Sequence, residues 1–458
     1  MRKNFFTLCL MAWAMIVPVK AAEPPVLTVE GGKVQGVVTE TPRVVVYRGI
    51  PYAAPPVGEL RWKEPQPVPS WQGVKVADTF GAPCFQPSHN VNNPNDFYAK
   101  EFFWMGDPEF SEDCLYLNVW TPASGKTGEK LPVAMWIHGG AYHAGWGHEI
   151  EMDGEAWAKR GVILVTINYR LGYFGFFTHP LLSAESPNGV SGNYGLFDQL
   201  AALKWIQKNI AQFGGDPGNV TVLGQSAGAG SVQALVASPL SGGLIHKAII
   251  QSGGGLRSVG TPVQGRTDLD MAEKNGKAMM DLAGKKSLQE MRAMTYKEIV
   301  ELAEKASANQ ITVRKSPVID QYFSVASFSD AVRSGQVADI PYMIGSTAKD
   351  SNRGTEIEDF CLFREQSGKY PAFAYYFQRA LPGDDAGAFH SAELWYMFNT
   401  LSRSWRPFLP EDYVLSEQMM DYWTRFAKTG NPSGEGLPEW KAFTQSHPVK
   451  RILDINIK

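Results

Sequence analysis

The sequence predicts an α/β protein in which helices flank a large, mostly parallel central sheet, with a small β region at the N-terminus. From about residue 132 onward, short apolar runs typical of buried strands alternate with amphipathic helical patterns. The earlier part of the chain carries short β-rich runs at 34–38 and 44–47. We find no internal repeat and no Pro- or Ser-rich linker, so we expect residues 23–458 to form a single domain.

The first 22 residues read as a secretory signal peptide. Arg2 and Lys3 precede an uncharged run, Phe5 to Val19, and the small residues Ala21 and Ala22 follow it. A short membrane anchor is the alternative, but this run is shorter than the roughly 20 residues of a spanning helix. No later stretch approaches that length. The sequence therefore predicts a secreted or periplasmic protein without stable membrane insertion.

The sheet is expected from four apolar runs, and a helix is expected between two of them. Leu203, Ile206, Ile210 and Phe213 recur at helical spacing and would cover the sheet. Further helical patterns run over 268–305 and 415–428. The four predicted strands are 132–137, 162–167, 220–223 and 248–250.

The balance of charge excludes one class of partner. The 458 residues carry 43 basic and 46 acidic side chains, a net charge of −3, which gives no electrostatic footprint for nucleic acid. With 44% hydrophobic residues, the chain is typical of a globular protein.

A candidate nucleophile lies in the sequence Gly-Gln-Ser-Ala-Gly at 224–228. This pattern directly follows the strand-like run 220–223 and opens a helical stretch, so Ser226 would occupy a sharp strand-to-helix turn. The helix N-terminus would favour negative charge developing beside the hydroxyl. The alternative is a structural serine at a glycine-rich helix start.

A second glycine-rich turn follows the earlier strand 132–137. His138-Gly139-Gly140-Ala141-Tyr142 contains small residues that let backbone N–H groups approach a substrate carbonyl. Gly140 and Ala141, together with Ala227 after the serine, are the predicted oxyanion donors. A simple tight turn is the alternative.

These motifs and several others resemble the type-B carboxylesterases, the α/β-hydrolase family that includes the cholinesterases. The resemblance covers nearly all of the predicted mature chain. It is carried by YRGIPYA at 47–53, SEDCLYLN at 111–118, NYR at 168–170, GNYGL at 192–196, FGGDP at 213–217, FAKTGNP at 426–432 and Trp440. It implies an α/β-hydrolase fold and a serine esterase that needs no metal or organic cofactor.

The family order of the triad is serine, acid, histidine, and each member must be found in this chain. Of the histidines after Ser226, His246 is expected in a helix before the next strand and His447 in a surface loop. His390 stands in a segment that resembles the one around the family's catalytic histidine, so it is the predicted base.

The acid is expected just past the strand-like run 340–345. Asp350 falls where the family usually has Glu followed by Gly. Glu356, Glu358 and Asp359 remain alternatives. Ser252 resembles the residue that hydrogen-bonds the family's acid.

Three departures from the family pattern bear on substrate preference. Gln225 replaces the common Glu beside the nucleophile, and Ala141 replaces the third glycine of the oxyanion turn. Only 40 positions separate Asp350 from His390, which predicts a reduced cap over the site.

The resemblance also implies a disulfide between Cys84 and Cys114, closing an aromatic-rich loop. Trp104 lies ten residues before Cys114, as does the cation-binding tryptophan of cholinesterases. The alternative for Trp104 is an apolar wall. Gln225, Trp104 and Tyr142 are the predicted substrate contacts.

The predicted function is hydrolysis of small-molecule carboxylic esters through an acyl-enzyme. The rivals are a non-catalytic binding protein on the same fold, and an amidase or lactonase that uses the same triad. The oligomeric state cannot be inferred from these patterns.

Overall fold

The computed structural model describes residues 24–41, 43–93, 95–122, 128–257, 265–350 and 354–455. The predicted signal peptide lies outside these ranges. Within them, no helix is both long and apolar enough to cross a bilayer.

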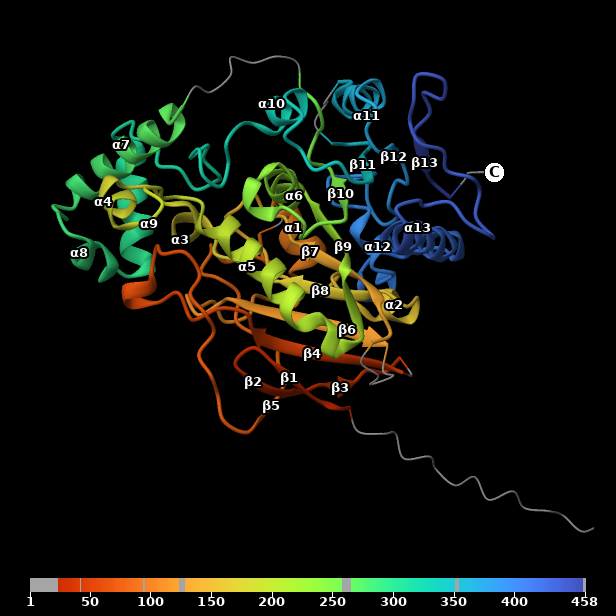
Figure 1. The fold of residues 1–458 in the computed structure, drawn as a ribbon, viewed down its shortest axis with the longest axis horizontal. Helices are drawn as coiled ribbons and strands as arrows, with labels where there is room; N and C mark the ends of the chain where they lie inside the picture. Colours follow the sequence, from red (N-terminus) through yellow and green to blue (C-terminus); the bar gives the residue numbers. More distant parts are fainter. Residues whose placement is uncertain are drawn as a thin grey trace, which may run out of the picture.

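One ten-stranded sheet runs through the centre of the molecule (Figure 1). The strands from β7 to β13 pair in parallel, whereas β3, β4 and β6 join the other end in antiparallel register. In spatial order the strands are β13 (Arg451–Leu453), β12 (Ala372–Phe377), β11 (Tyr342–Thr347), β10 (Lys247–Gln251), β9 (Gly215–Gln225), β7 (Leu131–Ile137), β8 (Ile163–Ile167), β6 (Tyr116–Pro122), β4 (Val44–Pro51) and β3 (Val37–Val38). The prediction of a large, mostly parallel sheet is confirmed.

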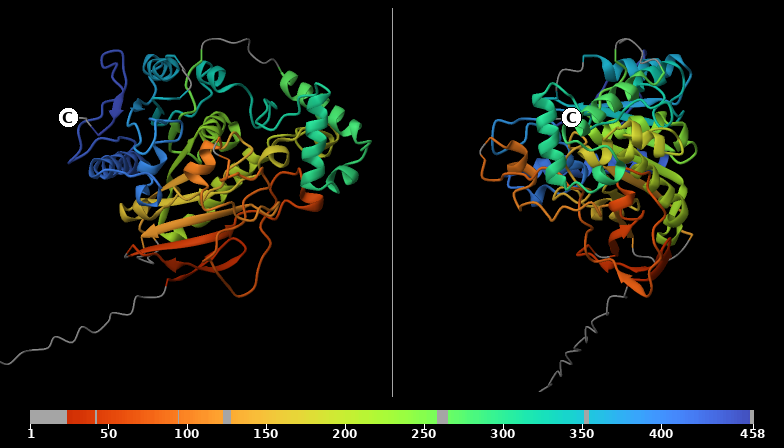
Figure 2. Two further views of the ribbon diagram at one scale, coloured as in Figure 1. Left: turned by 180° about the vertical axis from the view of Figure 1, so that it is seen from behind. Right: turned by 90° about the vertical axis from the view of Figure 1, so that its left-hand side faces the viewer.

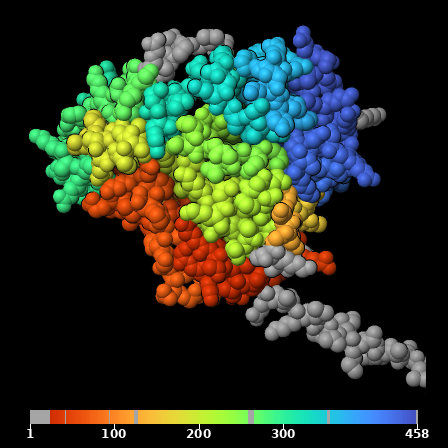
Figure 3. Space-filling view, viewed as in Figure 1, coloured from red at the N-terminus to blue at the C-terminus, as the bar shows by residue number. Residues whose placement is uncertain are grey.

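A separate three-stranded sheet forms the small N-terminal β region. It consists of β1 (Val26–Val29), β2 (Gly32–Gln35) and β5 (Val74–Val76), paired in the order β1-β2-β5. Figure 3 shows this N-terminal part, in red and orange, at the base of the molecule, away from the C-terminal segments in blue.

Helices cover both faces of the large sheet because its central strands are apolar on both sides. In β7, Val133, Met135 and Ile137 belong to a core shared with α5 (Tyr194–Asn209) and α6 (Ala227–Ala237). Ala134 and Trp136 belong to a second core, shared with α2 (Glu155–Lys159) and α13 (Pro410–Thr429). Figure 2 shows the fold from behind and from one side, with helices on either side of the sheet.

The helices agree broadly with the sequence patterns. Leu203, Ile206, Ile210 and Phe213 are all buried, as predicted for the helical face. The helices are α1 (Phe97–Phe102), α2 (Glu155–Lys159), α3 (Gly172–Phe176), α4 (Pro180–Glu185), α5 (Tyr194–Asn209), α6 (Ala227–Ala237), α7 (Thr267–Leu282), α8 (Leu288–Arg292), α9 (Tyr296–Ala308), α10 (Phe328–Arg333), α11 (Glu356–Gln366), α12 (Leu394–Met397) and α13 (Pro410–Thr429). Short 3₁₀ turns are η1 (Gly58–Leu60), η2 (Ile210–Phe213), η3 (Pro239–Ser241) and η4 (Leu401–Arg403).

The helical pattern at 268–305 divides into three helices, α7, α8 and α9. Gly284 has a φ of +67° just after α7, a conformation that most other residues avoid. Capping boxes at Ser287 and Thr295 then start α8 and α9. The helix-capping residues therefore divide a stretch that periodicity alone describes as one helical run.

Candidate active site

Ser226 lies on a strained turn between β9 and α6. Its φ of +57° and ψ of −120° fall in a region that non-glycine residues rarely occupy. The turn is held by a hydrogen bond from the Ser226 N–H to the Gln251 carbonyl of neighbouring β10, at 2.9 Å. The predicted strand-turn-helix arrangement is therefore present.

Two glycines let this turn approach the neighbouring strand. A Cβ atom on Gly228 would lie 2.0 Å from the Ile137 carbonyl oxygen at the end of β7. A Cβ atom on Gly224 would lie 2.6 Å from the Gly228 backbone. Glycine is therefore required on both sides of Ser226 for β7, β9 and α6 to pack this closely.

The turn after β7 lies beside the serine. Gly140 and Ala141 line the same cavity as Ser226 and both have positive φ, at +93° and +53°. The Gly140 carbonyl is occupied within the turn, accepting from the His143 and Ala144 N–H groups at 3.0 Å. Ala227 is the first residue of α6, where N–H groups lack intrahelical acceptors. The three predicted oxyanion donors thus come from two turns at one edge of the sheet.

His390 and Asp350 are in contact. Nδ1 of His390 hydrogen-bonds to Oδ1 of Asp350, and the Asp350 side chain is 4% exposed. Asp350 follows β11, and His390 follows β12, so adjacent parallel strands bring the two segments together. Among the described residues between them, α11 and β12 are the only helix and strand.

The other histidines and acids considered from sequence lie elsewhere. His246 sits in a turn before β10, where its Nδ1 accepts from the Val220 N–H at 3.2 Å. Glu358 is paired with Lys450. Glu356 accepts from the Gly255 N–H at 3.4 Å.

The Asp350 carboxylate is held ionised by its donors. Burial opposes ionisation, but hydrogen bonds from His390, from Ser252 and from the Thr347 N–H outweigh it and hold the pKa of Asp350 below its usual value. The Thr347 N–H lies 3.1 Å from Oδ2. Ser252 therefore occupies the supporting position that the family resemblance implies.

Gln225 contacts the opposite nitrogen of His390. Because Nδ1 faces Asp350, the remaining nitrogen, Nε2, is free to accept a proton or a hydrogen bond. The Gln225 amide nitrogen lies 3.1 Å from this Nε2. In this state the imidazole atom suited to take the serine proton is bound to Gln225, so Gln225 adjoins the base directly.

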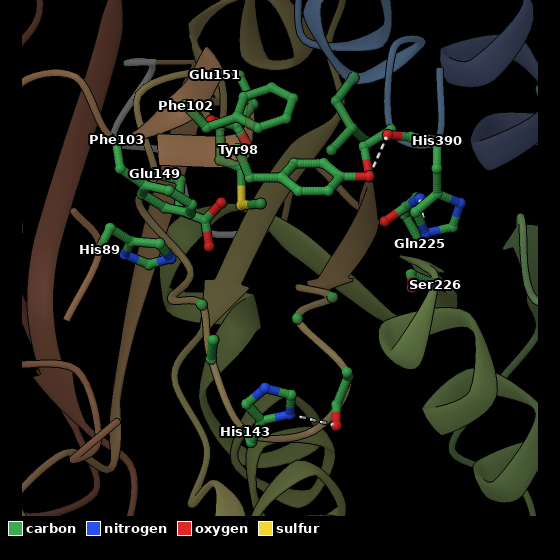
Figure 4. Close-up of a pocket in the computed structure, with 18 residues that line it drawn as sticks. His89, Tyr98, Phe102, Phe103, His143, Glu149, Glu151, Gln225, Ser226 and His390 are labelled. Carbon is green, nitrogen blue, oxygen red and sulfur yellow. Dashed lines mark hydrogen bonds between the residues drawn. The ribbon is translucent and has the colours of Figure 1, made fainter. Parts of the chain in front are cut away.

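A cavity of about 310 Å³ opens onto Ser226 and His390 (Figure 4). The Tyr98 hydroxyl, from α1, donates to the His390 carbonyl at 3.1 Å and reaches across the cavity. The lining residues are His89, Tyr98, Phe102, Phe103, Gly139, Gly140, Ala141, His143, Ala144, Gly145, Glu149, Glu151, Met152, Gln225, Ser226, His390, Ser391 and Leu394.

Two of the three predicted substrate contacts do not line this cavity. Trp104 is 47% exposed, and the neighbouring Phe102 and Phe103 line the cavity instead. The Tyr142 side chain hydrogen-bonds to Ser231 of α6 and stacks edge-on against Phe176. Gln225 alone of the three faces the cavity.

The predicted disulfide between Cys84 and Cys114 is absent from the structure. Both are buried free thiols, and the Cys114 thiol hydrogen-bonds to Cys84. Backbone pairing closes the base of the loop without a covalent bond, since the Ser111 N–H donates to the Pro83 carbonyl at 2.9 Å. The family resemblance therefore predicted correctly that the two cysteines lie close together, but the predicted disulfide is not present.

Sequence reasoning missed three buried glutamates near the site. Glu393 is fully buried three residues after His390, and burial together with the charge of Asp350 raises its pKa to about 7. Glu149 and Glu151 form part of the cavity wall. Their only signal in the sequence is their place shortly after the oxyanion turn. No group of three or more His, Cys, Asp or Glu side chains in the described ranges is arranged to hold a metal ion.

Comparison with known proteins assigns the family. The model of the carboxylesterase family matches residues 23–360 and 355–458. Para-nitrobenzyl esterase of Bacillus subtilis is 33% identical, over 94% of this chain and 95% of that protein. Fumonisin B1 esterase of Sphingopyxis macrogoltabida is 38% identical, over 77% of this chain and 61% of that protein.

Solved structures give the same result. A thermophilic para-nitrobenzyl esterase superposes with a TM-score of 0.79 at 30% identity, covering 94% of this chain and 96% of that one. A carboxylesterase of Geobacillus stearothermophilus superposes with a TM-score of 0.75, with the same identity and coverage. The chain, with its α/β-hydrolase fold, therefore belongs to the carboxylesterase family and is a serine carboxylic ester hydrolase.

Proposed function

We propose that the protein hydrolyses small-molecule carboxylic esters through an acyl-enzyme formed on Ser226. His390 takes the Ser226 proton, Ser226 Oγ attacks the ester carbonyl carbon, and the negative carbonyl oxygen is held by the N–H groups of Gly140, Ala141 and Ala227. As the carbonyl re-forms, the alcohol leaves with the proton from His390. Water then attacks the acyl group in the same way, releasing the acid and free Ser226.

The observation that carries this mechanism is the hydrogen bond between His390 and Asp350 beside the strained Ser226 turn. An ionised Asp350 favours the tautomer with its proton on Nδ1, which leaves Nε2 able to accept the serine proton. For the attack, Nε2 exchanges its contact with Gln225 for one with Ser226.

Replacing the nucleophile tests the mechanism. Ser226→Ala should lower kcat for 4-nitrophenyl acetate on the order of 10⁶-fold, the size seen when a serine protease loses its serine. Ser391→Ala, which alters another serine of the cavity wall, is the matched control and should stay within a few-fold of wild type. Retained turnover in Ser226→Ala would contradict the proposal, whereas wild type that bound esters without hydrolysing them would favour the binding-protein alternative.

The wider substrate class needs its own comparison. Matched amides and lactones assayed beside the esters distinguish an amidase or lactonase, because the same triad supports all three reactions. We expect the esters to react faster than the amides, since an alcohol is a better leaving group than an amine. Lactones are cyclic esters, so their rate relative to the open-chain esters tests the lactonase alternative.

We also propose that the protein is exported, secreted or periplasmic, after removal of its first 22 residues. The support is the basic start, the uncharged run and the small residues of that segment. Mass spectrometry of the N-terminus, taken from fractionated cells and medium, tests it. An intact Met1 on protein retained in the cytoplasm would contradict it.

A further inference from the structure

Glu149 and Glu151 lie on the side of the cavity opposite Ser226 and His390. Figure 4 shows both carboxyl groups beside Phe102 and Phe103, across the cavity from His390. Glu149 is 8% exposed and Glu151 is 1% exposed. The proposed ester-hydrolysis mechanism gives neither residue a role.

The oxygens of this pair have too few donors. Glu149 Oε1 accepts from the Trp146 N–H at 2.8 Å, Glu151 accepts from its own N–H, and the two carboxyl groups contact each other. No donor from the described residues reaches Glu151 Oε2. Two carboxyl groups in contact need either a shared proton or an added cation, because two like charges at this distance repel strongly.

In the described part of the chain, no fixed positive side chain lines the cavity to compensate the pair. The described residues that line the cavity include no lysine or arginine. Nearby charges are already engaged, since Glu101 is paired with Arg406 and His89 with Asp107. The other titratable neighbours include His138 and His148, whose pKa values burial lowers to about 4 and about 3, the buried Tyr169, and His143 of the cavity wall.

The pair therefore carries a proton near neutral pH. Burial raises the pKa of Glu149 to about 7. Burial and the charge of Glu149 raise the pKa of Glu151 well above its usual value. A cation that entered the cavity would displace this proton.

We propose that Glu149 and Glu151 bind the protonated amino group of an ester substrate, so that the enzyme prefers esters carrying a primary amine. This inference rests on the proposed ester hydrolysis at Ser226. A primary ammonium supplies N–H donors to the carboxyl pair, and these charge-assisted bonds are stronger than neutral ones.

Calorimetry with benzylammonium chloride tests binding apart from catalysis. Wild type should bind benzylammonium at least tenfold more tightly than benzyl alcohol, which has a similar size but no charge. Binding should release a proton, seen as a heat that varies with the ionisation enthalpy of the buffer. Affinity should therefore rise from pH 6 to pH 8, where the free amine is still protonated.

Variants assign the effect to these residues. Glu151→Gln and Glu149→Gln should each reduce the preference for benzylammonium tenfold or more, with Glu356→Gln as the control that keeps it. If a glutamine variant fails to fold, the pH dependence and proton release of wild type still decide the question. Equal binding of benzylammonium and benzyl alcohol, or binding without proton release, would overturn the proposal.

Matched substrates extend the test to turnover. We expect kcat/KM for 4-nitrophenyl 4-(aminomethyl)benzoate to exceed that for the 4-ethylbenzoate ester at least tenfold in wild type. Loss of that ratio in Glu151→Gln would support the subsite. Hydrolysis of 4-nitrophenyl acetate without any preference for the amino ester would overturn the subsite and leave ester hydrolysis standing. Binding of benzylammonium with proton release, but no hydrolysis of any ester, would overturn the proposed ester hydrolysis and leave the amine-binding site standing.

Discussion

Asp350 and the pair Glu149 and Glu151 are buried carboxyl groups of one site, yet their oxygens are satisfied very differently. Asp350 receives hydrogen bonds from His390, Ser252 and the Thr347 N–H, and its pKa is lowered. The two carboxyl groups of the pair share only the backbone N–H groups of Trp146 and Glu151 as donors among the described residues, and the pKa of both members is raised. Burial is common to both, so the number of donors decides which carboxyl group is charged at neutral pH.

This difference matches the work each group can do. A catalytic carboxylate must stay ionised through the reaction, in order to orient the imidazole and stabilise its charged form. A carboxyl pair short of donors is suited to receive a donor from a ligand. The protein therefore supplies enough hydrogen-bond donors to the buried carboxylate on one side of the cavity, and too few to the buried carboxyl pair on the other side.

Removing the charge at Asp350 should produce the largest effect in this comparison. Asp350→Asn should lower kcat about 10⁴-fold, because an amide allows His390 to take the wrong tautomer, as in a serine-protease triad. Steady-state assays of Asp350→Asn beside Glu356→Gln and Glu358→Gln check it.

The two glutamine variants are the controls and should stay near wild type. If Asp350→Asn kept most of the activity while one of them lost it, the third member of the triad would be misassigned. Asp350→Glu adds a finer test, because near-normal activity would mean that the loop accepts the longer side chain usual in the family.

Disturbing the oxyanion turn should have the next largest effect. In Gly140→Ala the new Cβ atom would lie 2.0 Å from the Ala144 carbonyl oxygen at a φ of +93°, so the turn must shift. Loss of one oxyanion donor costs about 10²–10³ in kcat. Gly128→Ala is the control, because Gly128 has a similar φ of +92° but a Cβ atom added there would have no other atom of the described residues within 4 Å. A Gly140→Ala enzyme with unchanged kcat would show that this turn does not hold the oxyanion.

A carboxylate placed at Gln225 should have a smaller effect that depends on pH. Gln225→Glu puts a negative charge against His390 Nε2, which favours the protonated imidazole and so disfavours removal of the serine proton. The acid limb of the kcat/KM profile should move about one unit to higher pH, with roughly tenfold less activity on that limb.

Gln225→Met is the comparison for that variant, since it keeps the size and removes the polar contact. Its pH profile should keep the position of wild type. An identical profile for Gln225→Glu and wild type would mean that the contact at 3.1 Å has no influence on the base.

Removing one charge from the acidic pair should give the smallest effect, on stability. The folded pKa of Glu149, about 7, lies above its unfolded value, so wild type should lose stability as pH rises from about 4.5 to 7. Glu149→Gln should remove part of this loss and raise Tm by a few °C at pH 8, with little change at pH 4. Thermal melts across this range check it, and a lower Tm at pH 8 than at pH 4 in wild type and variant alike would contradict it.

The sequence was sufficient for the parts of the site that depend on short-range patterns. Ser226 and the turn at Gly140 follow apolar strands directly, so the neighbouring sequence predicts both their position and the presence of a sharp turn. Asp350 was predicted from its position after a strand and His390 from the family resemblance of its segment, and the pairing of β11 with β12 brings them into contact.

Other features depend on side-chain direction, which the sequence does not contain. Trp104 and Phe103 are neighbours in the aromatic loop, yet only Phe103 faces the cavity. Glu149 and Glu151 alternate with Ile150 in an irregular segment, so no periodicity indicates that both would be buried. Cys84 and Cys114 were correctly expected to be close, but proximity does not decide whether two thiols are oxidised.

The most direct test of the mechanism is to trap the acyl-enzyme. Wild type mixed with 4-nitrophenyl acetate and quenched in acid within milliseconds should carry one acetyl group, which peptide mass spectrometry should assign to Ser226. Ser226→Ala treated in the same way should carry none. An acetyl group on another residue, or steady release of nitrophenol without any covalent adduct, would contradict nucleophilic catalysis by Ser226.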